Sequence, residues 1–236
     1  MRPGDDLGAL VASVAPEDLG DGDLLCVAHK VVSKAEGRIR SLADIDPEQR
    51  AVALAAEQGK DPRVVQAVLD ESVSVLRAAN GVLICETRHG WVCANAGVDQ
   101  SNTGSPDELV LLPEDPDRSA RQLRAVLAAA RGVRPAVVVS DSFGRAWRLG
   151  QTDVALGVAG LVVLDDRRGQ TDARGRELRA TMIAVADAVA GAADLARGKD
   201  SDEPVVLVRG LGPYVSGEDG PGAAMLRRPA EEDLFR

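Results

Sequence analysis

The stretch that most constrains the fold of this chain runs from residue 135 to residue 153. It opens with the apolar, largely β-branched run Ala136–Val139, which predicts a buried strand. Ser140, Asp141 and Ser142 follow directly, and arginines lie just beyond them. A buried strand that ends in carboxylate and hydroxyl oxygens, with guanidinium groups nearby, can hold a hard cation and a phosphate together. The same residues also suit a strand followed by an ordinary polar turn, so both interpretations stand at this point.

Length and charge narrow the class of protein further. The 236 residues contain no clear linker, and we expect a single domain over residues 1–236. The net charge of −9 argues against a nucleic-acid or membrane-surface binder, which needs a basic excess. No apolar run approaches the length of a membrane-spanning helix, and no signal peptide begins the chain. We therefore expect a cytoplasmic protein whose three cysteines, Cys26, Cys85 and Cys93, are buried free thiols.

A cluster of cationic side chains follows the apolar run Leu24–Ala28, which predicts a second strand. His29, Lys30 and Lys34 lie here in a chain otherwise rich in acidic residues. Lys34 could hold a phosphate as a mobile point charge. The competing interpretation is an edge strand protected by its lysines. For His29, the sequence does not separate a structural role from a substrate contact.

A second oxygen-rich segment is the small, polar loop at residues 95–102, which contains Asp99 and Asn102. Asp99 could complete a metal site with Asp141, because carboxylate oxygens are the ligands that magnesium and manganese prefer. Asn102 could contact a nucleotide. The commoner local outcome is an Asx turn, in which both side chains bond only their own backbone.

The remaining pattern predicts an α+β fold, with mixed and largely antiparallel sheets packed with helices in two layers. An antiparallel meander is predicted over residues 74–94, where Asn80 and Gly81 form a strong hairpin-turn dipeptide. No P-loop and no G-x-G-x-x-G fingerprint occurs, so we expect a non-Rossmann, non-P-loop protein. Helices are expected at residues 7–14, 47–58, 62–69, 115–130 and 177–193, and a final strand at residues 204–209.

Three finer expectations concern individual segments. Asp117 or Ser119 is expected to cap the helix at residues 115–130. Residues 157–164 are interpreted as the end of a helix followed by a strand, and the Gly-rich residues 214–222 as mobile.

Six segments, in order along nearly the whole chain, carry a resemblance to a known family. They are residues 30–37, 86–90, 93–102, 140–148, 150–153 and 208–210. Together they resemble the coenzyme F420-0:L-glutamate ligase family. The resemblance implies an enzyme that adds L-glutamate, through a γ-glutamyl amide bond, to the lactyl-phosphate arm of coenzyme F420-0, and in some cases to F420-1.

The resemblance also implies the cofactors and the assembly. GTP would be cleaved to GDP and phosphate through an acyl-phosphate intermediate, with Mg²⁺ or Mn²⁺ as the divalent metal, two ions per subunit, and K⁺ as a further candidate. The family works as a homodimer, and the small-residue helix at 177–193 and the strand-rich middle of the chain are candidate interfaces. Two alternatives remain: a related ligase acting on another carboxylate, and an inactive subunit that needs a full-length partner.

Carried over position by position, the resemblance assigns roles to individual residues. Asp99, Asp141 and Ser142 match metal-binding positions. Lys34 and Asn102 match GTP-binding positions, and His29 stands where the family often has a serine. The expected catalytic set, which acts on the transferring phosphoryl group, is Asp141, Lys34 and Arg145, with Arg148 as a further candidate. Relatives have a strand and a Leu-Pro segment ahead of residue 2, and some carry a C-terminal nitroreductase-like domain; we expect this chain to lack both.

Overall fold

The core of the fold is a four-stranded mixed sheet with the strand order β11-β1-β7-β8. The computed structural model describes residues 1–198 and 201–234. β1 (Leu24–Ala28) lies between β11 (Val205–Val208), to which it runs antiparallel, and β7 (Ala136–Arg145), to which it runs parallel. β7 then pairs antiparallel with β8 (Arg148–Ala159) in a long hairpin. Among the strand pairs of the described residues, only β1 and β7 run parallel.

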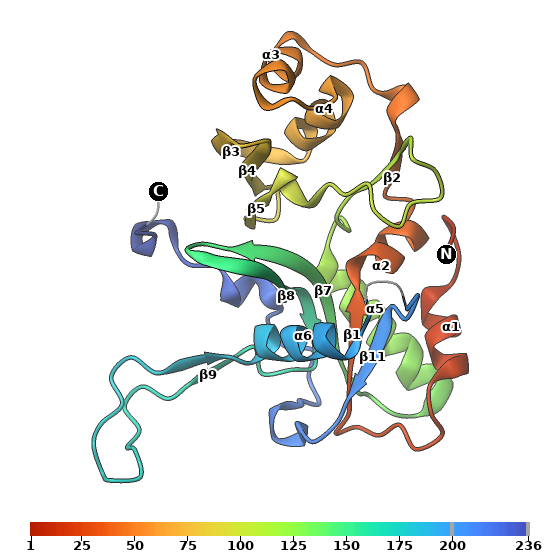
Figure 1. Ribbon diagram of the computed structural model, residues 1–236. Helices are drawn as coiled ribbons and strands as arrows, with labels where there is room; N and C mark the ends of the chain where they lie inside the picture. The colour runs from red at the N-terminus through yellow and green to blue at the C-terminus, as the bar shows by residue number, and fades with distance from the viewer. Residues whose placement is uncertain (199–200, 235–236) are drawn as a thin grey trace.

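Helices cover both faces of this sheet (Figure 1). Side chains alternate along a strand, so neighbouring residues face opposite sides. Val138 faces α6 (Val185–Ala196), and Val137 faces α1 (Leu7–Val14) and α5 (Pro116–Arg131). The two apolar clusters are built almost wholly from aliphatic side chains, in keeping with an aromatic content of 2%.

A second unit stacks against one end of this sheet and holds its own apolar cluster. It contains α3 (Gln49–Gln58), α4 (Pro62–Asp70) and a three-stranded meander of β3 (Ser72–Ala79), β4 (Val82–Thr87) and β5 (Val92–Ala94). The two units approach each other where β5 meets β7. The meander predicted from the sequence is confirmed.

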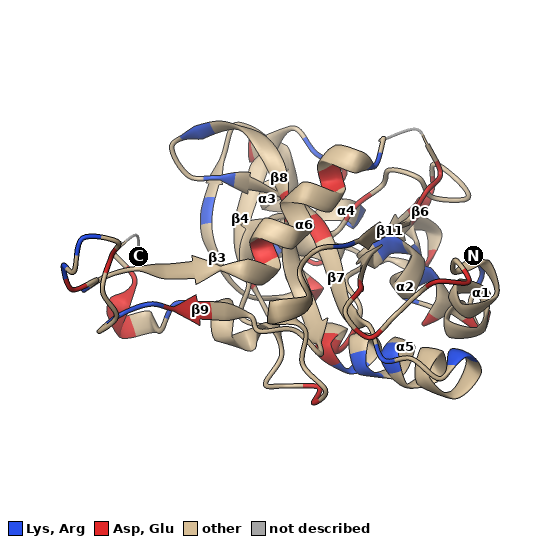
Figure 2. Ribbon diagram, turned by 90° about the horizontal axis from the view of Figure 1, so that it is seen from below, with Lys and Arg blue, Asp and Glu red and all other residues tan. Residues whose placement is uncertain are grey.

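Two further ribbons complete the structure. β2 (Ile39–Ser41) pairs with β6 (Glu108–Val110), and β9 (Leu164–Asp166) pairs with β10 (Met182–Ala184). The β9–β10 hairpin projects from the body, and Figure 2 shows acidic and basic residues side by side along it. Single 3₁₀ turns lie at Leu42–Asp44, Asn95–Gly97, Gly212–Tyr214, Ala223–Leu226 and Ala230–Glu232.

The α+β class is confirmed, and so are four of the five expected helices. The expected two-layer arrangement is wrong, because helices pack on both faces of the central sheet. The helix expected at residues 177–193 is wrong in its first half: α6 begins at Val185. Met182 and its neighbours instead pair with β9 as a strand. Their long and β-branched apolar side chains favour a strand when a partner strand is present, and local helix propensity takes no account of such a partner. No helix among the described residues is long and apolar enough to cross a membrane.

Three other boundaries differ from expectation. β7 does not end at Val139 but continues to Arg145, because β8 pairs with it along that length. Residues 157–164 contain no helix end; Gly157 lies within β8. The cap of α5 is Asp115, whose carboxylate accepts the Arg118 N–H at 2.9 Å.

The Gly-rich residues 214–222, expected to be mobile, are tied to the core. Arg124 of α5 is 1% exposed and donates to the backbone carbonyls of Ser216 and Gly217 and to the Asp219 carboxylate. The Ser216 N–H also donates to the Gly160 carbonyl at 2.8 Å. Because the N–H groups of this buried guanidinium are hydrogen-bonded to residues 216–219, they hold that segment against the core.

Candidate active site

The candidate site begins where β1 runs straight into the short helix α2 (His29–Ala35). The edge-strand interpretation of this segment is therefore wrong. As a helix, the segment directs Lys30 and Lys34 toward the loop at residues 95–102, while His29 points back into the sheet. The cationic cluster recognised in the sequence thus links the central sheet to the second oxygen-rich segment.

His29 lies against Asp141 of β7. Its Nε2 is 3.2 Å from Asp141 Oδ1, and its Nδ1 is 3.4 Å from Ser33 Oγ. The Nε2–Oδ1 approach lacks the geometry of a hydrogen bond, which leaves Nε2 a buried nitrogen without a hydrogen-bond partner among the described residues. The imidazole is buried, whereas Asp141 is partly exposed. His29 therefore contacts a predicted metal ligand, Asp141, on the side that faces the protein interior. Its predicted contact with the nucleotide stays a prediction.

The next residue, Lys30, lies against the other predicted metal carboxylate, Asp99. Lys30 Nζ is 2.7 Å from Asp99 Oδ2 and donates to Ser101 Oγ at 2.5 Å. Asp99 also accepts the Ser101 N–H at 2.6 Å, as in an Asx turn. Because it is paired with Lys30 as well, Asp99 does not bond only its own backbone, as that interpretation required. Burial by itself would raise the pKa of Asp99, but the bonds from Lys30 and Ser101 outweigh it and lower the pKa. Asp99 is thus held as a carboxylate.

Lys34 and Asn102, the two residues matched to GTP-binding positions, are also neighbours. Lys34 Nζ donates to the Asn102 backbone carbonyl at 2.5 Å. Asn102 takes a left-handed backbone conformation with φ of 56°, which asparagine tolerates better than most residues. α2 therefore reaches both the metal-type and the nucleotide-type residues of the loop.

The two adjacent residues Asp141 and Ser142 point to opposite faces of the sheet. Asp141 shares a face with α2, as its contact with His29 shows. Ser142 Oγ instead donates to Asp153 Oδ1 of β8 at 2.6 Å, and Arg197, at the end of α6, pairs with the same carboxylate. The three predicted metal ligands are therefore divided: Asp99 and Asp141 flank α2, and Ser142 lies on the α6 side.

The fold does not place Arg145 close to Asp141. It lies at the exposed end of the β7–β8 hairpin, where its Nη2 donates to the Leu149 carbonyl at 2.8 Å. Four residues along an extended strand separate it from Asp141, which corresponds to roughly 13 Å. Arg148 lies directly across the hairpin and is also exposed.

The donor set suits a hard divalent cation. Asp99 and Asp141 supply carboxylate oxygens and Ser142 a hydroxyl, and none of the three positions offers a soft sulfur ligand. Within residues 1–198 and 201–234, no group of three or more His, Cys, Asp and Glu side chains is assembled as a ready-made metal cluster. A cation held here would rely on the two carboxylates beside α2, with the remaining ligands coming from substrate and water, as is usual for magnesium.

Sequence reasoning missed Asp153 as a positioned residue and missed Arg197 altogether. Asp153 lies at the end of the stretch of residues 135–153. Its partners Ser140 and Ser142 can be assigned only once the register of β8 against β7 is known. The alternation of two serines in a strand was the one available signal.

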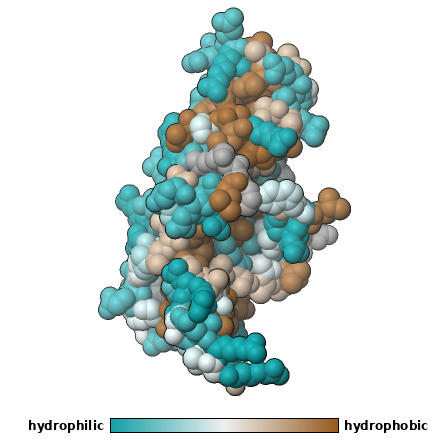
Figure 3. All heavy atoms as spheres, turned by 90° about the vertical axis from the view of Figure 1, so that its left-hand side faces the viewer, coloured by the Kyte–Doolittle hydropathy of each residue, from teal (hydrophilic) through white to brown (hydrophobic). Residues whose placement is uncertain are grey.

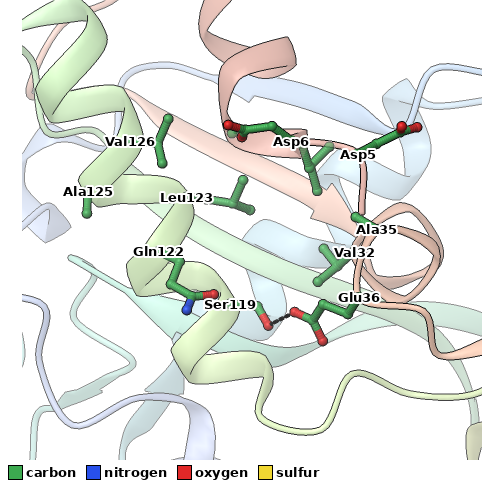
Figure 4. Close-up of a pocket in the computed structure, with 12 residues that line it drawn as sticks. Asp5, Asp6, Val32, Ala35, Glu36, Ser119, Gln122, Leu123, Ala125 and Val126 are labelled. Atoms are coloured by element: carbon green, nitrogen blue, oxygen red, sulfur yellow. Dashed lines mark hydrogen bonds between the residues drawn. The ribbon is translucent and has the colours of Figure 1, made fainter. Parts of the chain in front are cut away.

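A cavity of about 460 Å³ lies on another side of α2, between α1, α2 and α5. Figure 4 shows Leu123 and Val126 of α5 along one side of it and Val32 of α2 along the other, with the Ser119–Glu36 hydrogen bond at one end. None of the predicted site residues lines this cavity. It is separate from the residues that flank Asp99 and Asp141.

Comparison with known proteins places this chain in a class of enzymes. The model of the F420-0:gamma-glutamyl ligase family matches residues 1–210. A protein of Methanopyrus kandleri named coenzyme F420:L-glutamate ligase is 48% identical over 239 residues, which cover 100% of this chain and 93% of that protein. Proteins of the same name are 45% identical in Methanothermobacter thermautotrophicus, over 99% of this chain and 93% of the relative, and 41% identical in Methanocaldococcus jannaschii, over 94% and 88%.

These matches agree on one class, the ligases. The chain belongs to the F420-0:gamma-glutamyl ligase family.

Proposed function

We propose that this chain is a coenzyme F420:L-glutamate ligase that uses GTP and a divalent cation to join L-glutamate to coenzyme F420-0. The family match and the relatives support the ligase activity. The observation that carries the proposed use of a cation is the pairing of two consecutive residues with two carboxylates: His29 with Asp141 and Lys30 with Asp99. This pairing anchors both predicted metal ligands to the start of one short helix.

The chemistry needs a carboxylate to be activated before an amine can displace one of its oxygens. The acceptor carboxylate attacks the γ-phosphorus of GTP, the bond to GDP breaks, and an acyl phosphate forms. The glutamate amine then attacks the acyl carbon, the phosphate leaves with the bonding electrons, and the amine loses a proton. Mg²⁺ or Mn²⁺ supplies charge neutralisation between phosphates and carboxylate, which otherwise repel one another.

The residues of this chain have separate tasks in this scheme. Asp99 and Asp141 hold the cation. Ser142, which matches a metal-binding position, donates to Asp153 on the other face of β7 and would reach the same ion only after turning away from that carboxylate. Lys34 and Asn102 bind the phosphates or the sugar of GTP from α2 and the adjoining loop, with Lys34 stabilising charge on the transferring group. No side chain among these is an activated nucleophile, so phosphoryl transfer goes directly to the substrate. Arg145 joins the site only if the β7–β8 hairpin tip is brought to it by bound substrate or by a second subunit.

A homodimer is part of the proposal. The meander exposes four apolar side chains, Val73, Leu76, Val82 and Val92, which are between 37% and 68% exposed. Figure 3 shows apolar atoms gathered over the upper half of the molecule, which holds the meander. An exposed apolar patch of this kind favours association with a second copy. Three free thiols further favour a reducing cytoplasm as the place of action.

The experiment is a ligase assay on the purified chain with F420-0, L-glutamate, GTP and either Mg²⁺ or Mn²⁺. We expect a glutamyl-extended product by mass and one GDP released for each amide bond formed. Asp141→Asn keeps the volume of the side chain and removes its charge, so it should abolish the product. The matched control is Asp44→Ala, an exposed carboxylate on a 3₁₀ turn away from the site. GDP release without amide product, or product formation with another acid, would favour a related ligase instead.

A further inference from the structure

The cavity between α1, α2 and α5 has a mainly apolar lining. Its volume of about 460 Å³ is within the range of small-molecule sites in proteins. All three helices contribute walls: Leu7 comes from α1, Val32 from α2, and Leu123 and Val126 from α5. Packed protein interiors leave few voids larger than a water molecule, so a hollow of this size between helices has room for a ligand.

Three carboxylates line the same cavity. Asp5 and Asp6 lie just ahead of α1, and Glu36 lies at the C-terminal end of α2. All three are exposed, and Figure 4 shows them around the apolar side chains of Val32 and Leu123. The part of the lining that the structure describes contains no lysine, arginine or histidine. The cavity is therefore apolar within and negatively charged at its edge.

Each of these carboxylates uses one oxygen to hold the protein together. Asp6 Oδ1 accepts a backbone N–H of α1 at 2.8 Å, Asp5 Oδ2 accepts the Arg2 N–H at 2.7 Å, and Glu36 Oε1 accepts the Ser119 hydroxyl at 2.5 Å. Within residues 1–198 and 201–234, none of the three forms an ion pair with a basic side chain. A carboxylate has two oxygens and about four acceptor positions, so each can accept a further hydrogen bond.

Two arginines lie in an adjoining hollow. Arg38 and Arg118 line that hollow, which shares Glu36 with the cavity but not Asp5 or Asp6. Arg38 is already paired with Glu71 at 2.7 Å. The positive charge of the adjoining hollow therefore leaves the negative charge beside α1 uncompensated.

We propose that the cavity between α1, α2 and α5 binds a small organic cation, with an apolar body held between α2 and α5 and a protonated amine that donates to the carboxylates at the edge. An ammonium group has three N–H donors and no acceptor, so it complements a set of carboxylates. The apolar body gains free energy by leaving water for the apolar walls. The cavity is separate from the residues assigned to GTP and the divalent cation, so this inference does not rest on the proposed function.

The test is a titration of the ¹⁵N-labelled chain, followed by ¹H–¹⁵N NMR, with three probes that share one apolar body. They are 4-phenylbutylamine, 4-phenylbutanoate and 4-phenyl-1-butanol. We expect saturable shifts of the amides of Val32, Leu123 and their neighbours. The amine should bind about 5-fold or more tightly than the carboxylate, with the alcohol between them, because the charge at the edge attracts one ion and repels the other.

Four variants separate the charge from the apolar walls. Asp6→Asn keeps a side chain that caps α1, and Glu36→Gln keeps an acceptor for Ser119. Each should weaken binding of the amine by about 2–5-fold and leave binding of the alcohol unchanged. Ala125→Leu adds a side chain to the lining and should weaken binding of all three probes. Ala129→Leu is the matched control, because Ala129 is also exposed on α5 but lies outside the lining.

Three results would overturn the inference. The first is equal affinity for amine and carboxylate, which would remove the recognition of charge. The second is shifts gathered at the exposed meander residues, such as Val73 and Leu76, or at residues 99–102, because the amine would then bind elsewhere. The third is no saturation of the wild type by the amine. None of these readouts uses ligase activity, so each result leaves the proposed function standing.

Discussion

His29 Nε2 lies 3.2 Å from Asp141 Oδ1, with the imidazole side chain 2% exposed and the carboxylate 16% exposed. The histidine is thus behind the carboxylate and leaves the outer side of Asp141 free to face a ligand. Because His29 is followed directly by Lys30, which pairs with Asp99, the first two residues of α2 set the positions of both carboxylates.

This relationship predicts the effect of His29→Ala. Removing the imidazole frees Asp141 to change its orientation, and loss of such a supporting contact typically costs about 10–100-fold in metal affinity or activity. We expect the Mn²⁺ concentration needed for half-maximal ligase activity to rise, with little change in the KM for L-glutamate. Val32→Ala, a truncation of another buried residue of the same helix, is the control. An unchanged Mn²⁺ requirement would show that His29 does not act on Asp141.

The burial of the three cysteines predicts that their thiols react slowly in the folded protein. Burial raises the pKa of Cys26 to about 11 and that of Cys93 to about 12, and it also raises the pKa of Cys85. Thiolates are the reactive form, so the folded protein should react very slowly with a disulfide reagent at pH 8. All three thiols should react after denaturation. A thiol that reacts rapidly in the folded protein would argue against the packing around it.

Asp187 predicts a pH-dependent effect on stability. Burial raises its pKa, although its Oδ1 accepts the Ala155 N–H at 2.9 Å. A raised folded-state pKa means that the charge opposes folding above that pKa, and that the opposition disappears as the pH falls below the unfolded value. Asp187→Asn keeps an acceptor and loses the charge, so it should raise the free energy of unfolding at pH 7, with the gain vanishing in acid.

The companion variant at this position is Asp187→Ala. It removes the acceptor as well as the charge, and an unsatisfied buried N–H costs about 1–3 kcal/mol. Urea unfolding at pH 7 should therefore rank the three proteins as Asn, Asp, Ala in decreasing stability. An Asn variant less stable than wild type at pH 7 would mean that the carboxylate is stabilising there.

Gly157 predicts a steric effect. A Cβ at this position would lie 2.2 Å from the backbone carbonyl of Pro116, at the start of α5. Backbone atoms cannot move aside cheaply, and forcing extra atoms into a packed site typically costs about 1–3 kcal/mol or more. Gly157→Ala should lower the free energy of unfolding by at least this amount. Gly20→Ala, which meets nothing within 4 Å, should change it little. Equal stability of the two variants would contradict the close packing of β8 on α5.

Local signals in the sequence predicted the local structure well. Asn80 and Gly81 both have positive φ, 52° and 75°, as a tight hairpin turn requires, and the meander follows from that turn. The start of α6 could not be predicted in this way, because Met182 is drawn into pairing with β9 by a contact outside the segment.

The candidate site was predictable in its members but not in its geometry. Asp99 and Asp141 were recognised by their chemistry, whereas the Lys30–Asp99 pair joins residues far apart in the chain. The opposite orientation of Asp141 and Ser142 follows from β7 continuing as a strand, which depends on β8. Asp153 and Arg197 likewise meet only through tertiary packing of α6 on the sheet. Residues that act through long-range partners are therefore the ones that sequence patterns miss.

The most direct test of the proposed cation site is the mass of the product formed from F420-0, L-glutamate and GTP by three proteins: wild type, Asp141→Asn and Asp99→Asn. We predict a glutamyl-extended product from the wild type, dependent on Mg²⁺ or Mn²⁺, and none from either variant while both remain folded. Full product formation by both variants, or by the wild type with the divalent cation removed, would contradict the claim that α2 holds these two carboxylates for a cation.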